Sequence, residues 1–149
     1  MKKKEERKRI EREKQEQERK RTLGERYNKH QLQSNLNIDQ FDQLEEWTLL
    51  KCGDILFDSN VDDWSENTSV FNERIIGKKQ LTFLIEDEDG EIFGYYFNTE
   101  MIEKYDWYQE TDSKSFEFNL QSQNNRLSQP MKFEIKNIFW GIDLWEKSD

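Results

Sequence analysis

The side chains that most often carry chemistry are scarce in this chain. His30 is the only histidine and Cys52 the only cysteine. Two such residues cannot assemble a zinc site of the usual Cys/His kind. A Ser-His-Asp triad would have to use His30, and no nucleophile-elbow pattern is present. The six glycines are scattered and form no phosphate-binding loop. The sequence therefore predicts no catalytic, cofactor-binding or metal-binding residues, and a protein that is not an enzyme.

One acidic stretch invites a calcium interpretation. Counted from Asp58, positions 1, 3 and 5 of an EF-hand loop would be Asp58, Asn60 and Asp62. Position 6 is Asp63 where the template needs glycine, and position 12 is Ser69 where it needs glutamate. Because the turn residue and the bidentate ligand are both missing, we predict a polar loop without a specific divalent-metal site. An enzyme that uses carboxylates of this stretch stays open as an alternative. It would need an acidic pair in a pocket, with perturbed pKa values.

The composition indicates one folded domain. The chain has 149 residues, of which 37% are charged and 13% aromatic, and a disordered chain is usually poor in aromatics. No apolar run approaches the roughly 18–20 residues that span a bilayer. The N-terminus lacks the apolar region of a signal peptide, and one cysteine cannot form an internal disulfide framework. We therefore expect a reduced, cytoplasmic protein.

Charge divides the chain into a basic head and an acidic body. Residues 1–21 hold eleven Lys/Arg and six Glu, a net charge of +5, which leaves −14 for the rest. Opposite charges recur at helical spacing, as in Glu5 with Arg9 and Glu16 with Lys20. The sequence thus predicts a solvent-exposed helix without an apolar face over residues 2–21, then a linker over 22–36 and a folded body over 37–149.

The body begins with two helix signals. Asn37 and Gln40 form a capping-box pattern, which Leu36 and Phe41 extend to a hydrophobic staple. The helix that follows should pack its apolar stripe, Ile38, Phe41, Leu44 and Trp47, in the core. Its polar side should face water with Asp42, Gln43, Glu45 and Glu46. Asn67 is expected to cap a second short helix, with Gly77 after its end at positive φ.

Strand signals fill the remainder of the body. Residues 55–57 form a short apolar run typical of a buried strand. Residues 79–86 and 92–97 flank a polar turn that contains Asp-Gly, and they predict a β-hairpin with both faces covered. Residues 115–120 and 131–136 alternate apolar and polar, which predicts antiparallel strands with one wet face. A last strand is expected over residues 138–145.

Several segments, in a fixed order, resemble the front part of a TLDc domain. The pattern is a Phe-Asp step, an acidic loop, a short helix, and a strand pair that carries Gly and Tyr. The segments are Ile55-Leu56-Phe57-Asp58, Trp64-Ser65-Glu66-Asn67-Thr68-Ser69-Val70-Phe71, Ile85 through Gly94-Tyr95, Trp107, Thr111-Asp112, Phe116-Glu117-Phe118-Asn119-Leu120 and Met131-Lys132-Phe133. The similarity spans about residues 45–147.

The resemblance implies an α+β fold that is mainly antiparallel β, a partial TLDc-like β-sandwich with flanking short helices behind the charged helix. It also implies a cytosolic family linked to oxidative-stress resistance, several members of which bind the vacuolar proton-pumping ATPase. The family has no accepted catalytic residues to carry over.

Two departures from the family pattern matter. The second hairpin strand has Phe93-Gly94-Tyr95 where family members tend to have Gly-Gly-Tyr. The chain also ends near Leu144-Trp145, so we expect the back half of the sandwich to be absent. An exposed apolar face and self-association should follow, with Trp140 and Trp145 near that face. The strand residues at issue are Leu81, Phe83, Leu84, Ile85, Ile92, Phe93, Tyr95, Phe97, Phe116, Phe118, Leu120, Met131, Phe133 and Ile135.

These observations predict a non-catalytic TLDc-like interaction module with a protein partner and no cofactor. The resemblance suggests the vacuolar proton-pumping ATPase as that partner. A second hypothesis is a nucleic-acid or anionic-surface binder through the basic N-terminal segment, by charge alone. The acidic body argues against nucleic acid, because it repels phosphate. A carboxylate-based enzyme is the third hypothesis.

Overall fold

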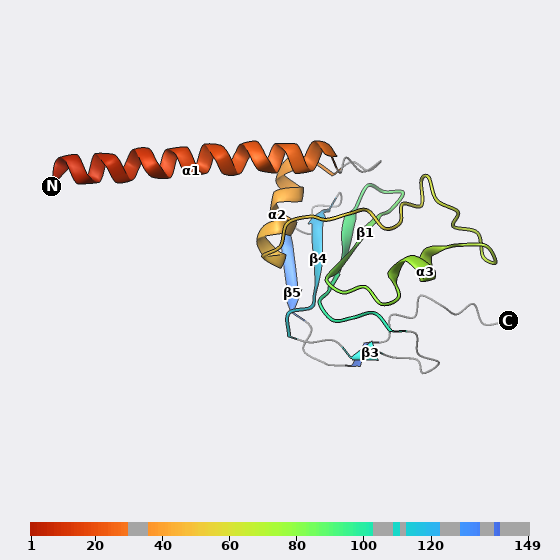
Figure 1. Ribbon diagram of the computed structural model, residues 1–149. Helices are drawn as coiled ribbons and strands as arrows, with labels where there is room; N and C mark the ends of the chain where they lie inside the picture. The colour runs from red at the N-terminus through yellow and green to blue at the C-terminus, as the bar shows by residue number, and fades with distance from the viewer. Residues whose placement is uncertain (30–35, 103–108, 111–112, 123–128, 135–138, 141–149) are drawn as a thin grey trace. The chain divides into compact units, whose positions relative to one another are not determined.

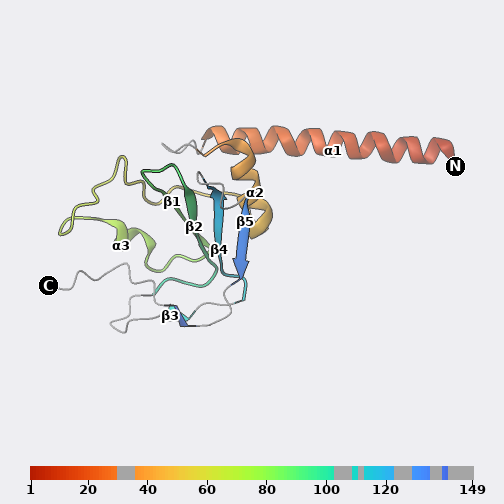
Figure 2. The same cartoon turned by 180° about the vertical axis from the view of Figure 1, so that it is seen from behind.

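The computed structural model describes residues 1–29, 36–102, 109–110, 113–122, 129–134 and 139–140. The chain divides into two compact units, Met1–Asp54 and Ile55–Asp149. Helices α1 and α2 make up the first unit, and a short helix and the strands make up the second (Figures 1 and 2). The α+β class, with mainly antiparallel strands, short helices and a charged N-terminal helix, is thereby confirmed.

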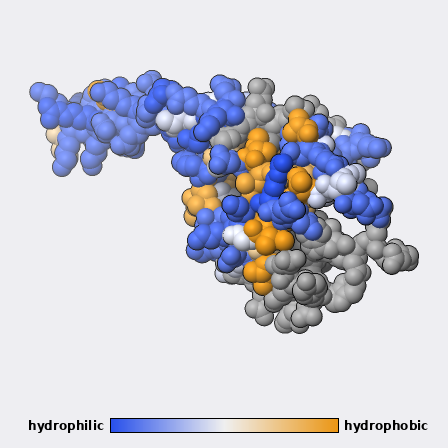
Figure 3. Space-filling view, turned by 45° about the vertical axis from the view of Figure 1, so that its right-hand side comes forward, coloured by the Kyte–Doolittle hydropathy of each residue, from blue (hydrophilic) through white to orange (hydrophobic). Residues whose placement is uncertain are grey.

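Helix α1 runs from Lys2 to Lys29 and is hydrophilic along almost its whole length (Figure 3). Every residue from 2 to 21 is exposed, as predicted. The linker predicted over residues 22–36 is wrong for its first eight residues, which continue the helix. Leu23 is buried there, and the Tyr27 hydroxyl donates to the Leu36 carbonyl at 2.7 Å. Tertiary packing thus extends a helix that composition alone would have ended. His30 and the rest of the linker up to residue 35 lie outside the described residues.

Helix α2, Ile38–Thr48, begins at the predicted capping box. The Asn37 side chain accepts from the Gln40 N–H, and the Gln40 side chain accepts from the Asn37 N–H, both at 2.9 Å. Phe41 is buried and meets the Tyr27 ring edge-on, with centroids 5.7 Å apart. On the polar side of α2, Glu45 is buried, whereas the sequence predicted that it would face water.

Helix α3, Phe71–Ile75, is shorter and begins later than expected. Val70 occupies the N-cap position, so the prediction of Asn67 as the cap is wrong. The Ser69 hydroxyl accepts from the Phe71 N–H instead, at 3.2 Å. Gly77 has φ +76°, as predicted, and its N–H donates to the Met101 carbonyl at 2.7 Å. Glycine permits this turn without steric cost, and the turn ties the end of α3 to the segment that follows strand β2 (Ile92–Phe97).

Residues 55–57 do not form the predicted strand. Ile55 is exposed, and the Arg74 guanidinium donates to the Leu56 carbonyl at 3.2 Å. Phe57 packs in an aromatic cluster, 5.3 Å from Trp64 and 5.0 Å from Phe71 between ring centroids. A short apolar run does not distinguish a strand from a loop whose side chains are packed.

Four strands form an antiparallel sheet in the order β1-β2-β4-β5. They are β1 (Leu81–Glu86), β2 (Ile92–Phe97), β4 (Phe116–Gln121) and β5 (Met131–Glu134). Strands β3 (Gln109–Glu110) and β6 (Phe139–Trp140) pair separately. The predicted hairpin is confirmed by the β1–β2 pairing, which aligns Leu84 with Gly94. Of the last predicted strand, residues 138 and 141–145 lie outside the described residues.

The sheet has two apolar faces with different surroundings. On one face, Ile92, Tyr96, Phe116, Phe118 and Leu120 are all buried. On the other face, α3 supplies Ile75 to a core with Phe97 and Met101. Partly buried side chains pack against that core, namely Phe71, Leu81, Phe83 and Tyr95. Helix α3 therefore covers the part of this face around Leu81, Phe83, Tyr95 and Phe97.

Burial of the fourteen apolar strand residues only partly matches the prediction of an exposed face. The buried ones are Ile92, Phe97, Phe116, Phe118 and Leu120. The half-buried ones are Leu81, Phe83, Leu84, Phe93 and Tyr95. The exposed ones are Ile85, Met131 and Phe133. Ile135, Trp145 and the side chain of Trp140 lie outside the described residues.

Two expectations about covered and wet faces need correction. Both faces are covered in β2, where every residue is buried or half-buried. In β1, Thr82, Ile85 and Glu86 are exposed, so coverage of that strand is incomplete. Strand β5 was predicted to have one buried face, yet all four of its residues are exposed. Strand β5 lies at the end of the sheet and, among the described residues, pairs with β4 alone.

Candidate functional site

Two arginines of α1 meet two carboxylates of α2. Arg19 and Arg26 are seven residues apart, about two helical turns, so both lie on one side of α1. One Arg19 nitrogen donates to both oxygens of Asp42, at 3.0 and 3.2 Å. The Arg26 guanidinium forms a true fork with Glu45, at 2.9 and 2.6 Å. A fork of this kind specifies orientation as well as distance. Together the two contacts determine the register between α1 and α2.

Glu45 is the most buried charge of this contact. Its residue is 8% exposed, and its carboxylate also accepts the Cys52 N–H at 2.8 Å. Burial opposes the charged form, but the hydrogen bonds from Arg26 and Cys52 outweigh it, so the pKa of Glu45 lies below its ordinary value. The carboxylate is therefore anionic at neutral pH. Its chemistry is that of a structural anchor rather than a proton donor.

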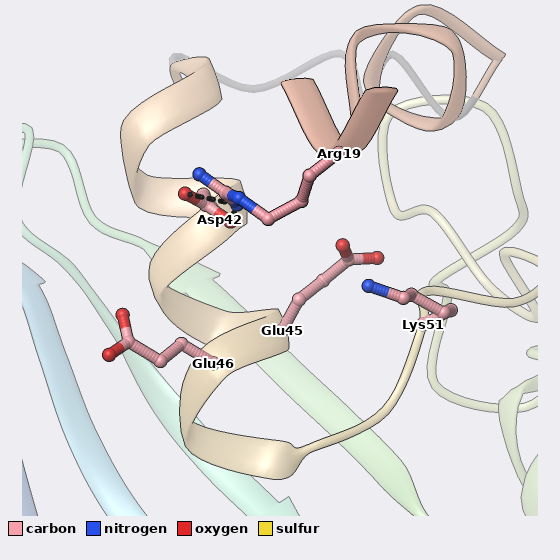
Figure 4. A pocket seen from close by; sticks show the side chains of 5 residues that line it. All are labelled: Arg19, Asp42, Glu45, Glu46 and Lys51. Atoms are coloured by element: carbon pink, nitrogen blue, oxygen red, sulfur yellow. Dashed lines mark hydrogen bonds and ion pairs between the residues drawn. The ribbon is translucent and has the colours of Figure 1, made fainter. Parts of the chain in front are cut away.

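A polar recess lies beside this contact (Figure 4). Its lining residues are Arg19, Asp42, Glu45, Glu46 and Lys51. The Glu45 carboxylate and the Lys51 ammonium point toward one another, and Glu46 points away from them. Small-molecule sites are mostly apolar, with a few converging polar groups. This recess is lined by charged residues instead, and two of its carboxylates, Asp42 and Glu45, face cations, so it does not resemble such a site.

The Asp58–Asp63 stretch directs its carboxylates at its own backbone. Asp58 accepts the Asn60 N–H at 2.9 Å, and Asp62 accepts the Asp58 N–H at 2.8 Å. Asp62 also pairs with Arg74 at 2.8 Å. Asp63 accepts the Ser65 N–H at 2.9 Å and the Ser65 hydroxyl at 2.6 Å. These oxygens stabilise the loop as a set of local turns rather than converging on a common point.

Two aspartates of this stretch, Asp62 and Asp63, have lowered pKa values, because their charged forms are stabilised. Hydrogen bonding from the Asp58 N–H, with the Arg74 ion pair, lowers the pKa of Asp62. Hydrogen bonds from Ser65 and Thr68 lower the pKa of Asp63. A carboxylic general acid requires the opposite shift, which burial or a like charge produces. Neither aspartate therefore has the pKa of an acid catalyst.

Two further residues were singled out by chemistry, His30 and Cys52. His30 lies outside the described residues, and Cys52 is exposed. Among the described residues, no group of three His, Cys, Asp or Glu side chains is placed to hold a metal ion. Over the same residues, no helix has the length and apolarity needed to cross a membrane.

A row of side chains across the sheet carries exposed apolar residues. The strand register aligns Ile85 with Phe93, Phe93 with Asn119, and Asn119 with Met131. Opposite residues of paired strands project to the same face, so these four form one row on the face that α3 covers elsewhere. Ile85 is 48% exposed and Met131 38%, while Phe93 is half-buried.

A second row runs parallel to the first. The register aligns Phe83 with Tyr95, Tyr95 with Glu117, and Glu117 with Phe133, which is 42% exposed. We call the exposed apolar members of the two rows, Ile85, Met131 and Phe133, together with half-buried Phe93, the open sheet face. It is the part of this face of the sheet that lies beyond the α3 core.

Sequence reasoning missed the Arg26–Glu45 pair and found only part of the open sheet face. The sequence did contain a signal for this pair. Arg19 and Arg26 are seven residues apart on one helix, and the acids Asp42 and Glu45 are three residues apart on the next. The open sheet face was partly visible from the alternation of strands 115–120 and 131–136. Comparison of the chain with protein-family models, with curated proteins and with solved structures finds no match in any of the three.

Proposed function

We propose that this chain is a non-catalytic interaction module that binds a protein partner on the open sheet face. The observation that carries the proposal is the row from Ile85 to Met131, which crosses all four strands and keeps apolar side chains exposed at both ends. Exposed apolar patches of this kind mark protein-binding surfaces more often than isolated exposed residues do.

The neighbouring core supports the same proposal. Helix α3 already packs Ile75 and Phe71 on this face, so a partner would continue the layer that α3 begins. Strand β5 adds an edge whose residues are all exposed, and an edge strand offers backbone groups for further pairing. A partner with an apolar helix or strand would bury Met131 and Phe133 together.

The resemblance to the TLDc family narrows the proposal. It suggests the vacuolar proton-pumping ATPase as the partner, oxidative-stress resistance as the process, and the cytosol as the place. The carboxylate-enzyme alternative loses its main support, since Asp62 and Asp63 have lowered pKa values and bind their own loop.

Binding of the full chain to the purified cytosolic part of that pump tests the proposal. A variant with Met131→Asp and Phe133→Asp places two charges on the open sheet face. Val61→Asp, at a 64% exposed loop position, is the matched apolar-to-acid control. We expect binding by the wild type and by Val61→Asp, and loss of roughly a hundredfold or more in the double variant, as for the removal of central interface contacts. Equal binding by all three proteins would refute the role of the sheet face. No binding by the wild type would refute the pump as partner.

A further inference from the structure

The cations of α1 fall into two groups with different surroundings. Between residues 16 and 26, Arg19, Lys20, Arg21 and Arg26 all form ion pairs with nearby carboxylates. Before that point, only Arg9 has such partners within the described part of the chain, namely Glu6 and Glu13. The cations of the first half that have no carboxylate of the described residues within ion-pair distance are Lys2, Lys3, Lys4, Arg7, Lys8, Arg12 and Lys14.

Five of these seven cations gather on one side of the helix. At about 100° per residue, Lys3, Lys4, Arg7, Lys8 and Lys14 fall within an arc of roughly 140°. All five are exposed. We call this arc the cationic face. Residues 2–14 carry eight Lys/Arg and four Glu, and only one of these glutamates, Glu11, lies within the arc. The rest of the circumference holds equal numbers of each sign, so the whole net charge of +4 resides on the cationic face.

An exposed isoleucine borders this face. Ile10 is the only apolar residue between Lys2 and Arg21, and it is 42% exposed. It lies three residues after Arg7 and four before Lys14, so it is a surface neighbour of both. The phosphates of a nucleic-acid backbone offer an isoleucine no apolar contact. The boundary between lipid headgroups and acyl chains does offer one.

We propose that the cationic face of α1 adsorbs to an anionic lipid bilayer. A flat surface of negative charge contacts one side of a helix, and the arc spans less than half the circumference. A helix seated in a DNA groove has phosphates along both flanks, which a wider distribution of cations would match. The adsorption is electrostatic, because one isoleucine is far less than the apolar face of an inserted helix. It is reversible and weakens as salt rises.

Vesicle sedimentation with the full chain at low salt tests this inference. One set of vesicles contains phosphatidylcholine alone, and the other also contains about one third phosphatidylserine. Each Lys or Arg near an anionic surface raises the partition coefficient roughly fivefold. The variant K4Q/R7Q/K8Q removes three charges from the cationic face. The control R9Q/K20Q/R21Q removes three ion-paired charges from the same helix and leaves the same net charge. Glutamine preserves helix propensity in both.

We expect binding to the phosphatidylserine vesicles only, a loss of roughly a hundredfold in the first variant, and a loss of less than about fivefold in the control. Far-UV circular dichroism confirms that both variants stay helical. Three results would overturn the inference: no binding of the wild type at low salt, equal losses in the two variants, or tighter binding to duplex DNA than to vesicles at matched phosphate concentration.

Discussion

Removing the charge of Glu45 tests the physical account of the first unit most directly. In Glu45→Gln the side chain keeps its size and one oxygen, so the Cys52 N–H can still be accepted. The Arg26 guanidinium then loses its carboxylate partner while its side chain is only 21% exposed. Asp42→Asn makes the same chemical change at the neighbouring pair, whose arginine is 44% exposed and whose aspartate is 33% exposed.

Burial decides the expected magnitudes. Breaking a fully buried ion pair by removing one partner costs about 3–5 kcal/mol, because a charge stays behind uncompensated. Arg26 keeps some access to water, so we expect Glu45→Gln to destabilise the α1–α2 contact by about 2–3 kcal/mol. Exposed pairs contribute about 0.2–1 kcal/mol, and Arg19 keeps Glu16 as a second partner. Asp42→Asn should therefore cost less than about 1 kcal/mol.

Native-state hydrogen exchange of the α2 amides is the assay, because it reads the stability of one unit without assuming that the whole chain unfolds together. At neutral pH, Glu45→Gln should speed exchange by roughly 30- to 150-fold, and Asp42→Asn by less than about fivefold. Replacing both partners, as R26M/E45M, should recover much of the loss, since no charge is then left unpaired. Equal effects of the two single variants would refute the argument from burial.

The same pair has a pH dependence whose sign follows from the lowered pKa. A carboxylate with a folded-state pKa below its unfolded value of about 4.5 stabilises the fold at pH above that value. This stabilisation is lost as the pH falls through the folded-state pKa. Protection of the α2 amides in the wild type should therefore decline below about pH 4.5, and the Glu45→Gln variant should lack this component. An identical acid profile in both proteins would contradict the assigned role.

Three further outcomes are expected. A Cβ on Gly94 would lie 1.9 Å from the Phe83 carbonyl oxygen and 2.8 Å from the Phe118 ring. Gly94→Ala should therefore lower the free energy of unfolding in denaturant by about 3 kcal/mol. In the control Gly53→Ala, the added Cβ meets nothing within 4 Å, so the free energy should change by no more than about 0.5 kcal/mol. Similar losses in the two variants would count against the predicted clash. A peptide of residues 2–21 should lose helical circular dichroism as salt rises; helicity indifferent to salt would exclude the ion-pair mechanism. Titration calorimetry should detect no stoichiometric micromolar calcium binding; such binding, abolished by Asp58→Ala, would overturn the calcium prediction.

The sequence predicted the elements whose signals are local. The capping box at Asn37, the hairpin around Gly90 and the exposed helix over residues 2–21 each depend on neighbours a few residues apart. Gly94 is a similar case, because a glycine inside a strand indicates close approach of another chain segment. The α+β class follows from such elements taken in order.

The errors arose where distant contacts decide the structure. Glu45 was expected in water because it stands among other polar residues, and its burial depends on an arginine nineteen positions earlier. Phe57 was expected in a strand, and its ring packs instead with Trp64 and Phe71. The helical hydrogen bonds after residue 21 continue because Leu23 and Tyr27 have tertiary partners. Of these contacts, only the Arg26–Glu45 pair leaves a spacing signal in the sequence; those of Phe57 and Tyr27 leave none.

The distribution of ion pairs along α1 gives one helix two separable roles. In its second half Arg19, Lys20, Arg21 and Arg26 form ion pairs, and two of these, Arg19 and Arg26, join it to α2. Its first half keeps an unneutralised cationic face and touches no other element through an ion pair in the described structure. Sites so far apart with no shared partners should behave additively. Glu45→Gln should then loosen α2 while leaving vesicle binding unchanged, and K4Q/R7Q/K8Q should weaken vesicle binding while leaving α2 exchange unchanged. Coupling between the two readouts would mean that α1 acts as a single unit, and that its charge split does not separate anchoring from adsorption.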